Sequence, residues 1–172
     1  MSLDVELLPA DPAWAPLLLR WRQQPLSVAY NPLLPLDEAG LRARLDRGTP
    51  PLDDPSAEHW RWFVAVGEEL VGTVSLGEVN RVAGNGILGW MTGAEHQGRG
   101  LATAAVSALV HKLFRETALV HLGARITCEN TASCRVAEKV GFRRDGRLRG
   151  YCRIGGVPRD QWYYGLVRGE ER

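Results

Sequence analysis

The sequence has no long apolar run and almost no net charge. It contains no stretch of about 18 consecutive apolar residues, so no segment is expected to span a bilayer. A formal net charge of +1 gives no overall attraction to nucleic acid or to an anionic membrane, which argues against both as partners. The opening residues, MSLDVELLP, carry early acids instead of the basic and then apolar pattern of a secretion signal. We therefore expect a cytoplasmic protein.

Cysteine is also scarce. Cys128, Cys134 and Cys152 form no C-x-x-C pair, and an odd number without metal-ligand spacing indicates reduced thiols and no bound metal. The 172 residues are 45% hydrophobic, which is enough to bury a sizeable core. We predict one domain over residues 1–172.

The order of patterned segments predicts a mixed α/β fold. Strands are expected near residues 4–8, 60–66, 70–79, 86–93, 119–128 and 162–167, and helices near 12–24, 38–47, 101–114 and 129–141. The proline-punctuated segments 26–35 and 49–59 are predicted to be loops. A strand, a helix and a strand at 86–128 should form a parallel pair with a right-handed crossover.

The segment QGRGLA (97–102) lies where a predicted strand ends and a helix begins. Helix starts carry unpaired backbone N–H groups, and glycines let a phosphate approach them closely. A tight strand-to-helix connection would explain the same glycines. The Walker pattern is absent, and Thr103 stands where the dinucleotide pattern G-x-G-x-x-G requires glycine.

The same segment matches the Q/R-x-x-G-x-G/A signature of the GNAT superfamily of acyl-CoA-dependent N-acyltransferases. LGWMT before it, NTASCRVAEKVGF after it and the later RDQWYYGL resemble segments of the branch that contains the ribosomal-protein N-terminal acetyltransferases. The resemblance runs from Asp4 to Val167. It implies a GNAT-like fold, with a central mixed antiparallel and parallel sheet whose fourth and fifth strands splay apart between flanking helices.

The resemblance implies that acetyl-CoA is the co-substrate and assigns residues to it. Its pantetheine arm would lie along the fourth strand and contact Asn130, its pyrophosphate would bind the glycine turn, and its 3′-phosphate could reach two cations at i, i+4 on the next helix. The residues of the fourth strand are Trp90, Met91 and Thr92. Those of the glycine turn are Gln97, Gly98, Arg99, Gly100, Leu101 and Ala102, and the two cations are Arg135 and Lys139.

The family transfers an acetyl group directly to an amine. Many members carry a tyrosine acid at the position of Ala137, so Ser133 is the predicted proton donor to the coenzyme sulfur, although it could equally cap the helix. The Met91 N–H is the expected oxyanion donor. Glu78 and Glu129 are the candidate general bases, and a water chain is the alternative to both.

The acceptor is predicted only as a primary amine, either a protein N-terminus or a small molecule. Segment AYNPLLP (29–35), the acids Asp53, Asp54 and Glu58, and the tryptophans Trp60 and Trp62 are candidates for shaping its pocket. A basic tract at 135–153 is expected to be a solvated face, with RNA binding as the alternative. An acyl-CoA-binding regulatory module with little catalysis stays open as the alternative function, and a homodimer is left open too.

Overall fold

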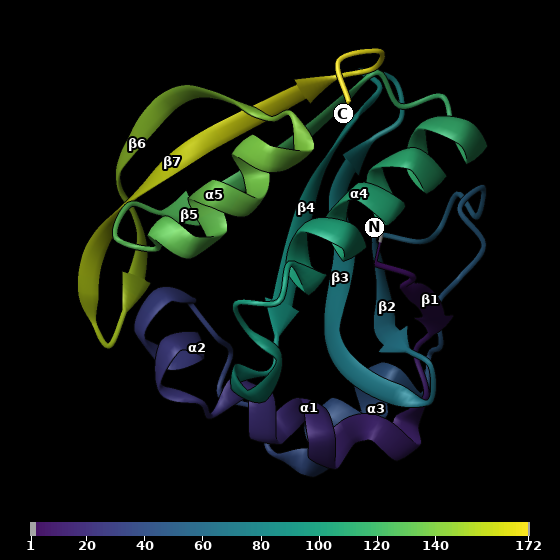
Figure 1. The fold of residues 1–172 in the computed structure, drawn as a ribbon, viewed down its shortest axis with the longest axis vertical. Coiled ribbons are helices and arrows are strands. Elements are labelled where there is room, and N and C mark those ends of the chain that lie inside the picture. Colours follow the sequence, from purple (N-terminus) through teal and green to yellow (C-terminus); the bar gives the residue numbers. More distant parts are fainter. Residues whose placement is uncertain (1–2, 172) are drawn as a thin grey trace.

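A seven-stranded mixed sheet forms the centre of the protein (Figure 1). The computed structural model describes residues 3–171. The sheet order is β1-β2-β3-β4-β5-β7-β6. The strands are β1 (Glu6–Pro9), β2 (His59–Val66), β3 (Glu69–Asn80), β4 (Asn85–Thr92), β5 (His121–Thr127), β6 (Arg143–Ile154) and β7 (Val157–Val167). The helices are α1 (Ala15–Arg22), α2 (Pro25–Tyr30), α3 (Glu38–Leu45), α4 (Leu101–Glu116) and α5 (Thr131–Val140), with 3-10 turns η1 (Pro12–Trp14) and η2 (Ala94–His96). The predicted mixed α/β fold is confirmed.

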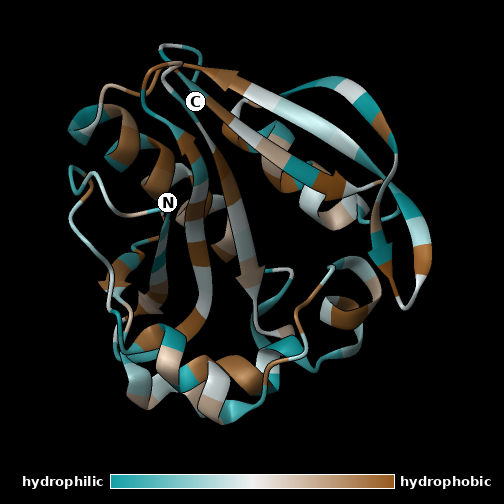
Figure 2. Ribbon diagram, turned by 180° about the vertical axis from the view of Figure 1, so that it is seen from behind, coloured by the Kyte–Doolittle hydropathy of each residue, from teal (hydrophilic) through white to brown (hydrophobic). Residues whose placement is uncertain are grey.

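Two buried apolar clusters hold helices against opposite faces of this sheet. The larger cluster packs α4 and α5 on one face through residues such as Val106, Leu109 and Leu113, whose helical spacing the sequence showed. The smaller cluster packs α1 and α3 around Trp21 and Phe63. Figure 2 shows the apolar residues concentrated along the central strands between the two layers. The first face is therefore covered by α4 and α5, whereas α1 and α3 cover the second face only around Phe63 and leave β4 partly open there.

The helix ends follow the capping residues read from the sequence. The Asp37 side chain accepts the Gly40 N–H at 2.8 Å and starts α3, and Asn130 accepts the Ser133 N–H at 3.2 Å and starts α5. Gly141 ends α5 with a φ of 114°, a left-handed conformation that favours glycine. Within residues 3–171, no helix combines the length and the apolar character needed to cross a membrane.

β4 and β5 are hydrogen-bonded neighbours over only half of their length. They pair in parallel from Asn85 opposite His121 to Leu88 opposite Ala124, and the pairing stops there. Beyond that point β4 stays with β3 and β5 stays with β7, each in an antiparallel pair. The two strands therefore separate toward their carboxyl ends (Figure 1), which confirms the expected splay.

The predicted loop at 26–35 is wrong in its first half, where the chain forms α2. The prediction treated Pro25 as a helix stop, but Pro25 is the first residue of a new helix. Proline is well suited to that position, because the first helical N–H has no partner to lose.

β6 is absent from the predicted order of elements, and its residues were assigned to a solvated basic face. Nearly all of them are exposed, so no alternating apolar pattern marks a strand. β6 is an edge strand that pairs only with β7, and its register shifts at Arg144/Gly146 and again at Leu148/Cys152. The strand forms because it pairs with β7, which follows it in the sequence, and no pattern within its own residues predicts it.

The carboxylate of Glu95 fastens α1 to the turn that precedes α4. It accepts hydrogen bonds from Arg20 at 3.1 Å, from the Trp21 indole at 3.1 Å and from the Gln24 amide at 3.0 Å. The Gln24 oxygen in turn accepts the Ala94 N–H at 2.8 Å. The backbone N–H of Glu95 and then the indole lower the pKa of this carboxyl to about 2.

Replacing Glu95 should weaken the fold in a pH-dependent way. Because the folded-state pKa lies below the unfolded value, its contribution is complete above about pH 4.5 and is lost as the pH falls toward 2. Glu95→Gln should therefore lower the free energy of unfolding by about 1 kcal/mol at pH 7, a value reduced for solvent screening of this partly exposed group. The deficit should shrink at pH 3.5, as measured by urea unfolding. Glu68→Gln, in the exposed β2–β3 turn, is the control, and an equal deficit at both pH values would contradict the assignment.

Candidate active site

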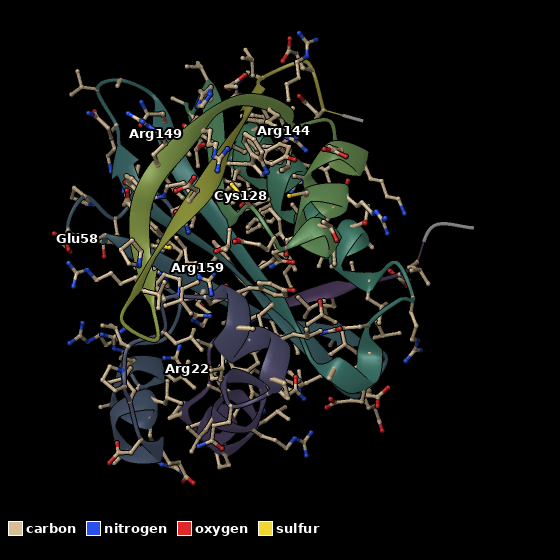
Figure 3. All side chains as sticks on the ribbon, turned by 90° about the vertical axis from the view of Figure 1, so that its left-hand side faces the viewer. Arg22, Glu58, Cys128, Arg144, Arg149 and Arg159 are labelled. Atoms are coloured by element: carbon tan, nitrogen blue, oxygen red, sulfur yellow. The ribbon has the colours of Figure 1, made fainter. Side chains whose placement is uncertain are left out.

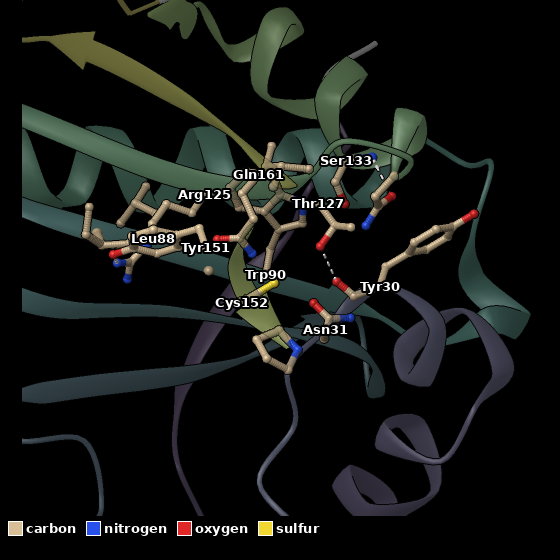
Figure 4. A pocket seen from close by; sticks show the side chains of 15 residues that line it. Tyr30, Asn31, Leu88, Trp90, Arg125, Thr127, Ser133, Tyr151, Cys152 and Gln161 are labelled. Carbon is tan, nitrogen blue, oxygen red and sulfur yellow. Dashed lines mark hydrogen bonds between the residues drawn. The ribbon is translucent and has the colours of Figure 1, made fainter. Parts of the chain in front are cut away.

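A cavity of about 330 Å³ lies in the opening between β4 and β5 (Figure 4). Its walls come from β4, β5, the start of α5, the β6–β7 hairpin and the segment after α2. Among the residues that line it are Asn31, Trp90, Arg125, Ser133, Tyr151 and Gln161. The Thr127 hydroxyl donates to the Tyr30 carbonyl at 2.7 Å, which ties α2 to β5 at this place. Tyr30, Asn31 and Pro32 of segment 29–35 line this cavity, and the role of the segment in an acceptor pocket stays a prediction.

The backbone of β4 presents unpaired polar groups to this opening. The Gly93 N–H donates to the Val71 carbonyl on β3 at 3.0 Å, and no register shift interrupts the pairing from Gly72 to Gly77. Because backbone groups of successive strand residues point to opposite edges, those of Trp90 and Thr92 face β5 and those of Met91 face β3. The expected oxyanion donor at Met91 is therefore misplaced, and the N–H that faces the opening is that of Trp90.

The turn from Gln97 to Ala102 presents free amides at the start of α4. In the part of the chain that the structure describes, no acceptor meets the N–H groups of residues 98–102, whereas the Gln97 N–H donates to the Ala94 carbonyl at 3.3 Å. Gly98 and Gly100 have φ values of 74° and 79°, which a residue with a Cβ rarely adopts. Five of the six predicted phosphate ligands thus have unpaired amides, and Gln97 instead donates from its side chain to the Thr92 carbonyl at 3.3 Å.

Asn130 and Ser133 meet at the cavity from the first turn of α5. The Asn130 oxygen caps the helix by accepting the Ser133 N–H, and this cap is compatible with the predicted contact to the coenzyme because the amide N–H₂ stays available to a ligand. The Ser133 hydroxyl lines the cavity and bonds to no group among the described residues. Ala137 is fully buried, and its position faces the core.

Neither predicted general base lines the cavity. Glu78, which has a φ of 50°, forms an ion pair with Arg125, and Glu129 pairs with Arg159 at 3.4 Å. The cavity wall has no carboxylate and no histidine. The cations Arg135 and Lys139 are exposed on one side of α5, outside both the cavity and every ion pair found in residues 3–171.

The acids proposed for the acceptor pocket lie away from the three cavities described here: Asp53, Asp54 and Glu58 line none of them. Trp60 and Trp62 are 1% and 4% exposed and belong to the core on the α4 face. Several arginines of the basic tract are balanced within the chain, for example Arg144 by Glu138 and Arg147 by Asp160.

Residues that the sequence did not single out complete the cavity. Arg125 donates to the Tyr151 hydroxyl at 2.6 Å, and these two side chains form one end of the cavity with Gln161 nearby (Figure 4). The sequence did contain one indication that Arg125 lies in the site, because it is a charged residue inside the otherwise apolar strand predicted at 119–128. Burial raises the pKa of the Cys152 thiol, which keeps this cavity cysteine protonated and unsuited to nucleophilic attack. Among residues 3–171, no cluster of metal-ligating side chains occurs.

Comparisons with known proteins identify this arrangement. The acetyltransferase (GNAT) domain family matches residues 4–143. The "Probable N-acetyltransferase YjcK" of Bacillus subtilis (strain 168) is 31% identical over 133 residues, which cover 77% of this chain and 74% of that protein.

Solved structures share the fold at lower identity. The Salmonella typhimurium acetyltransferase that modifies the N-terminal serine of ribosomal protein L7/L12 has a TM-score of 0.82 and 17% identity, over 95% of this chain and 94% of that one. The spermidine N-acetyltransferase of Vibrio cholerae, solved with CoA and spermine, has a TM-score of 0.84 and 18% identity, over 96% of both chains. Together with the family match over most of the sequence, these findings show that the chain belongs to the GNAT acetyltransferase family and is an N-acetyltransferase.

Proposed function

We propose that the protein transfers an acetyl group from acetyl-CoA directly to a primary amine, and that the acceptor is an α-amine of a peptide or of a small molecule. The observation that carries the proposal is the opened end of the β4–β5 pair, with the free amides of residues 98–102 near its mouth and the Ser133 hydroxyl in its wall. An extended chain can bond to the free edge of β4 like an added strand.

The residues present fit acetyl-CoA as a co-substrate. The amides of the turn, at the positive end of the α4 dipole, suit a pyrophosphate. Trp90 and Thr92 offer backbone groups to the amides of the pantetheine arm, and Asn130 offers its amide from across the opening. Arg135 and Lys139 would reach the 3′-phosphate from the exposed side of α5, as the family resemblance implied.

The reaction needs an oxyanion donor and a proton donor. As the acceptor nitrogen forms its bond to the thioester carbonyl carbon, the Trp90 N–H would donate to the carbonyl oxygen. The C–S bond then breaks, and the Ser133 hydroxyl delivers a proton to the leaving thiolate. The acceptor nitrogen releases its extra proton to water. Water then returns a proton to the Ser133 oxygen.

The absence of a carboxylate or histidine in the cavity wall favours an α-amine over a lysine. An α-amine with a pKa near 7.7–8.0 is neutral in roughly 10% of molecules at pH 7, whereas a lysine is neutral in fewer than about 0.1%. An α-amine can therefore react without a strong base.

Gly100→Ala tests the turn as the pyrophosphate site. Alanine at a φ of 79° costs about 1–2 kcal/mol, and relaxation of the turn redirects the amides that should hold the phosphates. The Kd for coenzyme A, measured by calorimetry, should rise about tenfold, equivalent to about 1.4 kcal/mol.

Gly48→Ala is the matched control for this strain. Gly48 has a φ of 65° and lies after α3, outside every cavity wall in residues 3–171. It should lose similar stability and keep its coenzyme affinity. Equal affinity in the two variants would show that the turn does not bind the pyrophosphate.

Ser133→Ala tests the transfer step. Loss of a general acid should lower kcat by about 100-fold or more, and the Kd for coenzyme A should stay within about twofold, because the hydroxyl serves only the leaving thiolate. The measurement is release of free thiol from acetyl-CoA with a panel of amines, and Ser107→Ala on α4 is the control. If the unsubstituted protein binds the coenzyme but releases no thiol with any amine, that result would contradict the proposed function and support a binding module.

A further inference from the structure

A second cavity adjoins the first on the side of α1 and the hairpin tip. It measures about 320 Å³ and shares Asn31 and Pro32 with the cavity between β4 and β5. Its other walls come from the end of α1, from residues 33–36 and from the tip of the β6–β7 hairpin. We call these two adjoining cavities, which share a wall at Asn31 and Pro32, the acceptor groove; Ser133 lines its inner part, and Arg22 and Arg153 line its outer part.

Arginines supply all the formal charge of this groove. Arg22 and Arg153 line its outer part and Arg125 its inner part, and no aspartate or glutamate lines either. Arg125 is balanced by Glu78, but within residues 3–171 neither Arg22 nor Arg153 has a carboxylate within ion-pair distance. Figure 3 shows Arg22 on the helices below the hairpin, well away from Glu58.

Two further arginines add to the charge around Arg22. Arg61 on β2 is partly buried and donates to the Thr73 hydroxyl at 3.2 Å, and Arg44 lies on α3. Burial and then the charges of Arg22 and Arg44 lower the pKa of Arg61 to about 10, and burial and then Arg44 lower that of Arg22. None of these three arginines has a carboxylate within ion-pair distance among the described residues, so the local charge favours binding of an anion.

We propose that the acceptor is an amine that carries an anionic group, a carboxylate or a phosphate, and that Arg22 and Arg153 bind this group at the outer end of the acceptor groove. This inference rests on the proposed acetyl transfer and narrows its substrate class. The guanidinium groups suit both anions, because each offers paired N–H donors to two oxygens at once. The Arg22 guanidinium already donates to the Leu34 carbonyl at 2.6 Å, which holds it at the rim of the groove.

The same charge affects the acceptor nitrogen. Nearby cations destabilise an ammonium and lower its pKa, so the neutral and reactive amine becomes more abundant. A polycation such as spermidine gains no partner in this groove and is repelled by it. Binding of the anion thus offsets the repulsion that a positively charged amine meets on entry.

The test compares acceptors that differ only in charge. With every peptide made as its C-terminal amide, Ser-Asp-Glu-Ala should be acetylated with a kcat/KM at least about tenfold above Ser-Asn-Gln-Ala, the size of one charged hydrogen bond, and Ser-Lys-Lys-Ala and spermidine should be the poorest acceptors. O-phosphoserine amide against serine amide, both of which carry an α-amine, separates a small phosphate-bearing acceptor from an acidic peptide. A preference for the anionic member of either pair supports the proposal.

Variants locate the anion. Arg22→Gln and Arg153→Gln should each lower kcat/KM for the preferred anionic acceptor by about tenfold and lower the value for the Ser-Asn-Gln-Ala amide much less, since only the anionic acceptor loses a charged hydrogen bond. Arg153→Glu, at an exposed position that should not disturb folding, should raise the rate with Ser-Lys-Lys-Ala. Arg149→Gln is the matched control, since Arg149 lies on the same strand, has no carboxylate partner among the described residues and lines no part of the groove.

Two outcomes would overturn the inference. One is equal or faster acetylation of the neutral or cationic acceptors, and the other is an equal effect of the Arg153 and Arg149 substitutions. Both outcomes can be observed only if the protein acetylates some amine. Failure of every amine to release thiol would instead refute the proposed function, so the two failures are distinguishable.

Discussion

The loss of hydrogen bonding between β4 and β5 after Leu88 and Ala124 is the constraint on which the rest of the site depends. Each strand keeps its outer partner, so the sheet does not unravel, but the inner edges are left unpaired over the last half of each strand. Unpaired backbone groups inside a protein are costly unless water or a ligand meets them. Here they line a cavity, which we propose receives a strand-like ligand, and the hydrogen bond from the Thr127 hydroxyl to the Tyr30 carbonyl closes one side of it.

The turn before α4 depends on this opening, because it follows directly from the free end of β4. Positive φ values at Gly98 and Gly100 turn the amides outward, and the carboxylate of Glu95 fastens the residues just before them to α1. Binding groups that are held in place before a ligand arrives lose little conformational freedom on binding. The Glu95 carboxylate also joins the end of α1, which lies beside the outer part of the acceptor groove, to this turn. The proposed coenzyme site and the proposed acceptor site are therefore held in place by the same side chain.

Sequence reasoning succeeded where the signal was local and failed where it was not. The helix caps, the β2–β3 hairpin and the glycine turn follow from residues a few positions apart. α2 was missed because Pro25 can both end and begin a helix, and β6 because only its pairing with β7 makes it a strand. In the site, Ser133 and Asn130 were found through motif spacing. Arg125 was missed because its partners, Glu78 and Tyr151, are 47 and 26 residues away along the chain. The charge of the acidic loop likewise does not predict which cavity the loop reaches, and its acids line none of the three described here.

The arginines of the acceptor groove and the missing general base are best understood together. A GNAT enzyme that binds a cationic amine through carboxylates must then remove a proton from a nitrogen whose charge those carboxylates stabilise. A groove with unbalanced arginines and no carboxylate in its wall has the opposite effect on the acceptor, because it destabilises the ammonium and favours the neutral amine. Binding energy must then come from another part of the acceptor, and an anionic group next to Arg22 and Arg153 supplies it without stabilising the ammonium. Neither Glu78 nor Glu129 has to act as the base, and both can stay in the ion pairs that position Arg125 and Arg159.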